Sequence, residues 1–73
     1  MDYQNYISIN SEIRFGKPCI KGTRISVYDI LGWLASGMSN EEIIKDFPLV
    51  KEEHILACLN YAAEKERRVK YVV

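Results

Sequence analysis

The chain has 73 residues and therefore forms one small domain, and a domain of this size buries only about 60% of the surface that its unfolded chain exposes. Its composition, 48% hydrophobic and 27% charged residues, excludes an intrinsically disordered chain. Ten basic and ten acidic residues cancel, which removes any argument from net charge for nucleic-acid binding, and no apolar run approaches the roughly 20 residues of a membrane span.

Residues 1–25 are expected to form a β arm or short hairpin. Apolar residues are separated there by the breakers Gly16, Pro18 and Gly22, a pattern typical of short strands joined by tight turns. Because proline cannot donate a hydrogen bond to a neighbouring strand, a strand that holds Pro18 lies at an edge or begins there. The arm also carries four cations with no acid between them: Arg14, Lys17, Lys21 and Arg24.

Residues 26–66 are expected to form a helical core of three short helices. In the first, over about 27–36, apolar residues recur at helical spacing. Ser26 is placed to cap its start, and Asp29 stands at the third helical position, as in a capping box. Gly37 provides a left-handed residue that ends the helix.

A second, shorter helix is predicted to follow directly. Ser39 and Glu42 have the spacing of a capping box, and Pro48 ends the helix after about two turns. Its inward residues are Ile43, Ile44 and Phe47. The link between the two helices is so short that they must cross at a steep angle.

The third helix is predicted over about 51–65, and residues 67–73 form a C-terminal tail, either frayed or a short strand. Helical spacing places one set of residues inward: Ile55, Cys58, Leu59 and Ala62. It places another set outward: Glu53, Ala57, Asn60 and Glu64. The expected fold is therefore mostly α, a three-helix helix-turn-helix bundle in one domain with an N-terminal β arm.

We expect a binding protein and not an enzyme, with no cofactor and no metal. The sequence holds one histidine and no phosphate-binding glycine loop, so hydrolytic and phosphoryl chemistry lack their residues. Cys19 and Cys58 lie among apolar residues, which favours buried free thiols. A zinc site that joins them to His54 would lack a fourth ligand.

Two regions are candidates for DNA contact. In a helix-turn-helix the second helix lies in the major groove, which makes Lys51, His54 and Asn60 candidates. Glu52 and Glu53 would repel phosphates there, although acids in a first helical turn also interact favourably with the helix dipole. The cations of the arm, Arg14, Lys17, Lys21 and Arg24, form the other candidate region.

The arm also has structural explanations. Exposed cations on a solvated hairpin discourage edge-to-edge aggregation, and this interpretation is as well supported as phosphate binding. For Gly22, Thr23 and Arg24 we favour a structural role, a tight turn that ties the arm to the helices, because glycine accepts positive φ.

The run IRFGKPCIKGTRISV at residues 13–27, followed by LASGMS, EEII and DFP at residues 34–39, 41–44 and 46–48, resembles the family catalogued as domain of unknown function 433. The resemblance spans about residues 9–63. It implies similarity to antitoxins of the VapB kind, a helix-turn-helix or winged-helix-like fold, and a gene beside that of a PIN-like nuclease toxin. Val50 departs from the pattern, which more often has Ser or Thr there. Loss of that cap would lower local stability by roughly 1 kcal/mol.

The resemblance implies an antitoxin-like module that neutralises the nuclease toxin and binds operator DNA. The alternatives are a DNA-binding regulator without a toxin and a protein-interaction module that binds no DNA. The basic residues of the C-terminal tail would suit the acid-lined metal site of a nuclease. Aromatic residues are further candidates, because they dominate the hot spots of protein interfaces. The candidate partner-binding residues are Tyr28, Trp33, Tyr61, Arg67, Arg68, Lys70 and Tyr71.

Trp33 has a second explanation, partial burial in the core, because it lies between two inward positions. A chain this small can hardly enclose eight aromatic residues, so a homodimer is expected. The N-terminal residues lack the pattern of a signal peptide, so the expected location is the cytoplasm, without membrane attachment.

Overall fold

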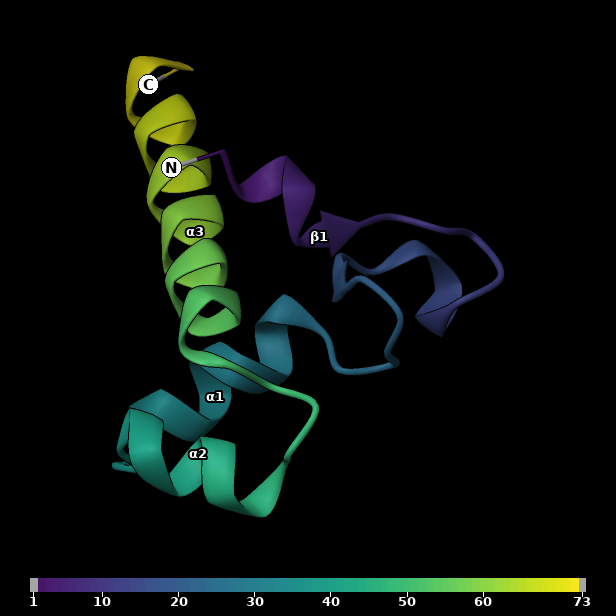
Figure 1. The fold of residues 1–73 in the computed structure, drawn as a ribbon. Coiled ribbons are helices and arrows are strands. Elements are labelled where there is room, and N and C mark those ends of the chain that lie inside the picture. Colours follow the sequence, from purple (N-terminus) through teal and green to yellow (C-terminus); the bar gives the residue numbers. More distant parts are fainter. Residues whose placement is uncertain (1, 73) are drawn as a thin grey trace.

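In the computed structural model, which describes the backbone of residues 2–72 and the side chains of residues 2–67, a small β arm packs beside a group of helices (Figure 1). The elements of these residues are the 3-10 turns η1 (Tyr3–Asn5) and η2 (Arg14–Gly16), the strands β1 (Ile7–Ser8) and β2 (Cys19–Ile20), and the helices α1 (Val27–Ala35), α2 (Asn40–Asp46) and α3 (Glu52–Val72). The predicted fold class, mostly α with a short N-terminal hairpin, is confirmed.

The hairpin of the arm is antiparallel. β1 pairs with β2 in the register Ile7 with Ile20 and Ser8 with Cys19. The Pro18 carbonyl accepts a hydrogen bond from the backbone amide of Val27, the first residue of α1, at 2.9 Å. Pro18 therefore stands immediately before its strand, as its missing amide requires, and the arm continues directly into the helices.

Both predicted capping boxes are present. The Asp29 amide donates to Ser26 Oγ at 2.9 Å, and the Ser26 amide donates back to Asp29 Oδ2 at 3.0 Å. Ser39 and Glu42 make the same reciprocal pair at 3.1 and 2.9 Å. Gly37 follows α1 with a φ of 103°, the left-handed stop that the sequence predicted.

The start of α3 differs from the expected one. Val50 is fully buried in the core, so an apolar residue is required where the family pattern more often has a hydroxyl. The cap is supplied from the other side, because the Lys51 amide donates to Nδ1 of His54 at 2.9 Å. One half of a capping box is thus made by a histidine, and the residue before the helix is Lys51 and not Val50, where the cap was expected.

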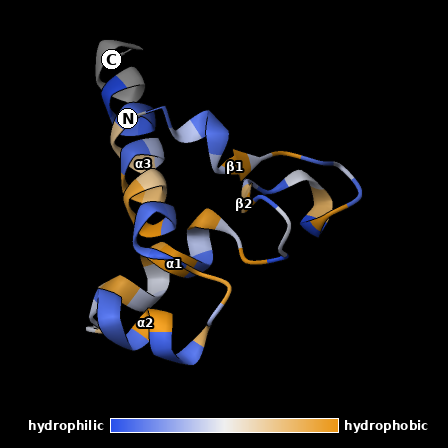
Figure 2. Cartoon of the chain, in the orientation of Figure 1, coloured by the Kyte–Doolittle hydropathy of each residue, from blue (hydrophilic) through white to orange (hydrophobic). Residues whose placement is uncertain are grey.

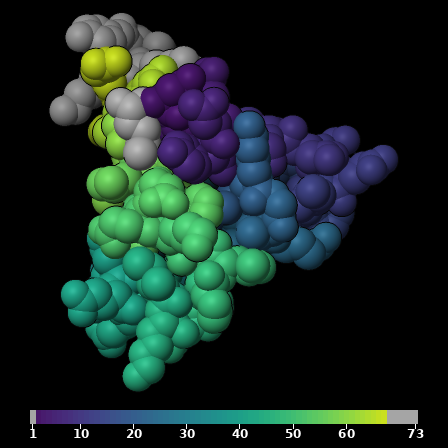
Figure 3. Space-filling view, viewed as in Figure 1, coloured from purple at the N-terminus to yellow at the C-terminus, as the bar shows by residue number. Residues whose placement is uncertain are grey.

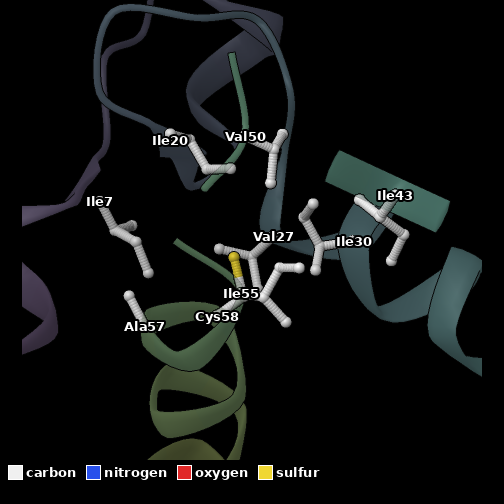
Figure 4. Packing of buried hydrophobic residues seen from close by; sticks show 9 residues of the cluster. All are labelled: Ile7, Ile20, Val27, Ile30, Ile43, Val50, Ile55, Ala57 and Cys58. Atoms are coloured by element: carbon white, nitrogen blue, oxygen red, sulfur yellow. The ribbon is translucent and has the colours of Figure 1, made fainter. Parts of the chain in front are cut away.

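The core lies where the arm, α1, α2 and the first turns of α3 meet, and hydrophobic residues concentrate there (Figure 2). Its buried apolar residues are Ile7, Ile20, Val27, Ile30, Ile43, Val50, Ile55, Ala57 and Cys58 (Figure 4). Every element of the chain beyond the two 3-10 turns contributes to this cluster. The arm is therefore part of the folded unit and cannot be an independent extension.

The N-terminal segment lies along α3, and this placement overturns one expectation (Figures 1 and 3). Ala57, predicted to face outward, is fully buried and points toward Ile7 (Figure 4). The rings of Tyr3 and Tyr61 meet edge to face with centroids 5.4 Å apart, and those of Tyr6 and His54 do so at 5.9 Å. α3 is therefore covered on a second face by residues that precede it by about fifty positions.

α3 is also longer than expected. The helix continues to Val72, across the segment predicted to be a frayed tail or a short strand. No glycine or proline follows Pro48, and residues 62–70 are rich in Ala, Glu, Lys and Arg, which are strong helix formers. Those propensities outweigh the weak alternation of the last five residues.

Candidate functional site

Arg14 serves the fold directly. Its Nη1 lies 3.0 Å from Asp29 Oδ2 and donates to the Arg24 carbonyl at 2.8 Å, which joins the tip of the arm to α1. Burial tends to raise the pKa of Asp29, but the hydrogen bonds from Ser26 and Arg14 outweigh it and hold that pKa below its usual value. The arm thus has three other cations on its surface, Lys17, Lys21 and Arg24, all exposed.

The turn between β2 and α1 is the tight turn that was predicted, whereas the side chain that ties it to α1 is that of Arg14 and not one of its own. Gly22 has a φ of 78°, which favours glycine. Thr23 Oγ1 donates to the Ile20 carbonyl at 2.9 Å and accepts from the Ile25 amide at 3.0 Å. These bonds close the loop on itself and present Lys21 and Arg24 outward.

The surface formed by the first turns of α2 and α3 is acidic, and one of its predicted DNA contacts is partly covered. Of the candidate DNA contacts on α3, Lys51 and Asn60 are exposed, whereas His54 is half-buried against Tyr6 and engaged at the helix start. The first turns of α2 and α3 present four acids: Glu41, Glu42, Glu52 and Glu53. This surface repels a phosphate backbone.

Trp33 belongs to the core boundary. Its ring stacks on Phe47 with centroids 4.1 Å apart and planes 7° from parallel, and both residues are half-buried. The stack fastens α1 to the end of α2. Partial core burial, the second of the two explanations considered for Trp33, is the one observed.

The other two predicted aromatic anchors meet at one groove. It has a volume of about 350 Å³ and runs between α1 and the distal half of α3. Its lining residues are Pro18, Val27, Tyr28, Leu31, Tyr61, Ala62, Lys65 and Glu66. Tyr28 is 77% exposed, and Lys65 Nζ lies 5.4 Å from the centre of the Tyr61 ring. We call this the α1/α3 groove.

Comparison with known proteins places this arrangement in a family. The family model described as "Protein of unknown function (DUF433)" matches residues 7–62. The chain belongs to the DUF433 family. A solved DUF433 member protein from Anabaena variabilis ATCC 29413 has a TM-score of 0.81 and 24% sequence identity, over 93% of this chain and 67% of that one. This likeness shows the shared fold, and no curated protein matches the chain.

Several apolar residues of this DUF433 domain are exposed although the sequence left them without a role or predicted them to be inside. Phe15 is 99% exposed at a turn where Arg14 and Phe15 have φ of 50° and 59°. Leu56 and Leu59 on α3 are 44% and 42% exposed, although Leu59 was predicted to be inside. The signal for the leucines was present, because apolar residues at 55, 56, 58, 59, 62 and 63 cover more than one helical face.

Of the predicted basic partner contacts in the DUF433 domain, Arg67 is exposed on α3. The side chains of Arg68, Lys70 and Tyr71 lie outside the described residues. In the described part of the chain no helix is long and apolar enough to cross a membrane, and no three His, Cys, Asp or Glu side chains are grouped to hold a metal ion. Cys19 and Cys58 are buried free thiols, as predicted.

Proposed function

We propose that this DUF433 domain is an antitoxin-like binding module that neutralises a partner nuclease of the PIN-like kind, with the α1/α3 groove as its contact surface. The observation that carries the proposal is the convergence of Tyr28 and Tyr61 on one apolar groove. Tyrosines that are partly exposed in a concave apolar setting are the residues most enriched in interface hot spots. Tyr28, at 77% exposure, lies at the surface of α1 where a partner side chain reaches it.

Charge supports the same kind of partner. Lys65 lines the groove, and Arg67, the residue directly after Glu66, is exposed. A nuclease with an acid-lined metal site attracts such cations and is blocked by them. Binding at the groove therefore brings the basic end of α3 toward that site.

The test is co-expression with the protein encoded by the neighbouring gene, followed by co-purification and an assay of its nuclease activity. We expect a stable complex, loss of RNA cleavage in it, and an affinity at least about 30-fold lower for Tyr28→Ala. Phe15→Ala is the matched control, because it removes an aromatic ring that is 99% exposed elsewhere. If Phe15→Ala abolishes the complex and Tyr28→Ala does not, the groove is the wrong surface.

Operator DNA binding is the second candidate, and the exposed cations of the arm favour it over α3. Lys17, Lys21 and Arg24 project from turns of one hairpin, where they can follow a phosphate backbone. Affinity for upstream DNA should then fall with salt, with a slope of about 0.9 per phosphate contact. Replacing the three cations by alanine should reduce that slope by roughly 2–3. A domain that fails to bind at low salt has no DNA-binding role.

A further inference from the structure

One face of α3 is exposed along its length, and the rest of the domain touches it at its first residue, where Glu52 Oε1 accepts a hydrogen bond from Asn40 Nδ2 of α2 at 2.8 Å. Residues at spacings of four, three, four and four lie on a single helical face, and all five are exposed: Glu52, Leu56, Leu59, Ala63 and Arg67. The N-terminal segment covers the face that carries Ala57 and Tyr61, and α1 approaches the side that carries Ala62 and Lys65. α3 runs along one edge of the molecule, so the remaining face is open to a large partner (Figure 1). We call it the outer face of α3.

The outer face has an apolar centre and opposite charges at its ends. Leu56 and Leu59 are 44% and 42% exposed and lie about one turn apart, so they form a small exposed apolar patch at the centre of the face. Glu52 stands at one end and Arg67 at the other, and their backbone positions are fifteen residues, or about 22 Å, apart along the helix axis. Two copies of this face are therefore complementary in charge when their helices run antiparallel.

We propose that the outer face of α3 pairs with the outer face of a second copy, antiparallel, about a two-fold axis between residues 59 and 60. In this register Glu52 of one copy faces Arg67 of the other, Leu56 faces Ala63, and the two Leu59 side chains meet beside the axis. A two-fold interface joins the same patch of both subunits, so the complementary pairs occur twice. Opposite charges at the two ends disfavour the parallel arrangement, which would place like charges together.

This pairing leaves the α1/α3 groove and the arm available, but it engages Arg67, one of the two cations proposed to attract the nuclease. Tyr28 and Lys65 face the α1/α3 groove and not the outer face, and Lys17, Lys21 and Arg24 lie on the arm. The inference is independent of the proposed function, because it concerns the purified domain alone.

The experiment is sedimentation of the purified chain across concentration. A face of five positions is small compared with standard interfaces, so we expect a change from monomer to dimer mass between about 1 μM and 1 mM. Leu59→Glu places two carboxylates beside the axis and should weaken the dimer at least about 30-fold. Leu49→Glu is the matched control, since Leu49 is 66% exposed outside this face, and Tyr28→Ala should also leave the dimer unchanged.

Charge reversal tests the register separately from any effect on folding. Glu52→Lys and Arg67→Glu should each weaken the dimer, and the double variant should recover at least half of the lost affinity, because the pair is restored across the axis. Circular dichroism checks that each variant keeps its helix content. A double variant no stronger than the weaker single one would overturn the pairing of Glu52 with Arg67.

Oxidative cross-linking tests the direction. Cys19 and Cys58 are buried, so an engineered cysteine on the outer face reacts on its own. Leu59→Cys should form a disulfide-linked dimer, whereas Glu52→Cys should not, because its copies lie about 22 Å apart in the antiparallel pair. Cross-linking of Glu52→Cys would show a parallel pair. A monomer at all concentrations would reject the interface itself.

Discussion

The guanidinium of Arg14 and the carboxylate of Asp29 meet at 3.0 Å, and the same carboxylate oxygen also accepts the Ser26 amide at the start of α1. The Asp29 carboxylate thus completes the cap of α1 and also binds Arg14 of the arm. Both side chains are about one-third exposed, at 32% and 28%, so solvent weakens their attraction. The pair orients the arm more than it stabilises the domain.

Arg14→Ala should lower the free energy of unfolding by about 0.5–1 kcal/mol, because it removes the ion pair and the bond to the Arg24 carbonyl. Urea denaturation followed by circular dichroism measures this change. Lys17→Ala is the control and should stay within about 0.5 kcal/mol of the parent chain. A larger effect of Lys17→Ala than of Arg14→Ala contradicts the internal role of Arg14.

The free energy of unfolding should fall at acid pH, in part because the Asp29 carboxylate becomes protonated. Its folded pKa lies below the ordinary 3.8, so the ionised form contributes stability that is fully present above the unfolded pKa and is lost as the pH falls through the folded pKa. The stability difference between the parent chain and Asp29→Asn should be constant above about pH 5 and shrink below pH 4. A difference that grows on acidification has the wrong sign for this account.

Trp33→Ala should lower the free energy of unfolding by about 2–4 kcal/mol, since it removes the stack on Phe47 and leaves a gap between α1 and α2. Circular dichroism is the suitable probe, because Trp33 is the only tryptophan. Phe15→Ala, at a ring that is 99% exposed, should change stability by less than about 0.5 kcal/mol. Equal losses in the two variants would refute the core role of Trp33.

Ala57→Leu should lower the free energy of unfolding by about 1–3 kcal/mol, because the added carbons have no room between α3 and Ile7. Ala63→Leu adds the same atoms to an exposed position on the same helix and should be close to neutral in dilute, monomeric protein. If both substitutions are neutral, the N-terminal segment does not pack on α3 in solution.

The two cysteines should resist thiol reagents in the folded domain. Cys19 and Cys58 are 2% and 0% exposed, and burial raises the pKa of the Cys58 thiol to about 12, so little thiolate forms near neutral pH. Native protein should react slowly with a chromogenic disulfide, and protein in strong denaturant should release two thiols per chain. Rapid reaction of either cysteine under native conditions would show that solvent reaches a thiol that is buried in this structure.

The sequence predicted the local features correctly because they depend on residues three or four positions apart. Ser26 with Asp29 and Ser39 with Glu42 are capping boxes in sequence and in structure. Gly37 and Pro48 mark helix ends by their own backbone preferences. The existence of three helices and a β arm follows from such signals without knowledge of the packing.

The sequence by itself therefore determined the elements, their caps and the family pattern, but only the tertiary structure decided which faces remained available. Ala57 and His54 are covered because Ile7 and Tyr6 reach α3 from fifty residues away, and Arg14 is engaged by a carboxylate fifteen positions along the chain. Helical periodicity states which residues share a face, yet it cannot state which of two apolar faces is enclosed. That choice depends on contacts between distant segments, and here it left Leu59 outside and brought Tyr28 and Tyr61 to one groove.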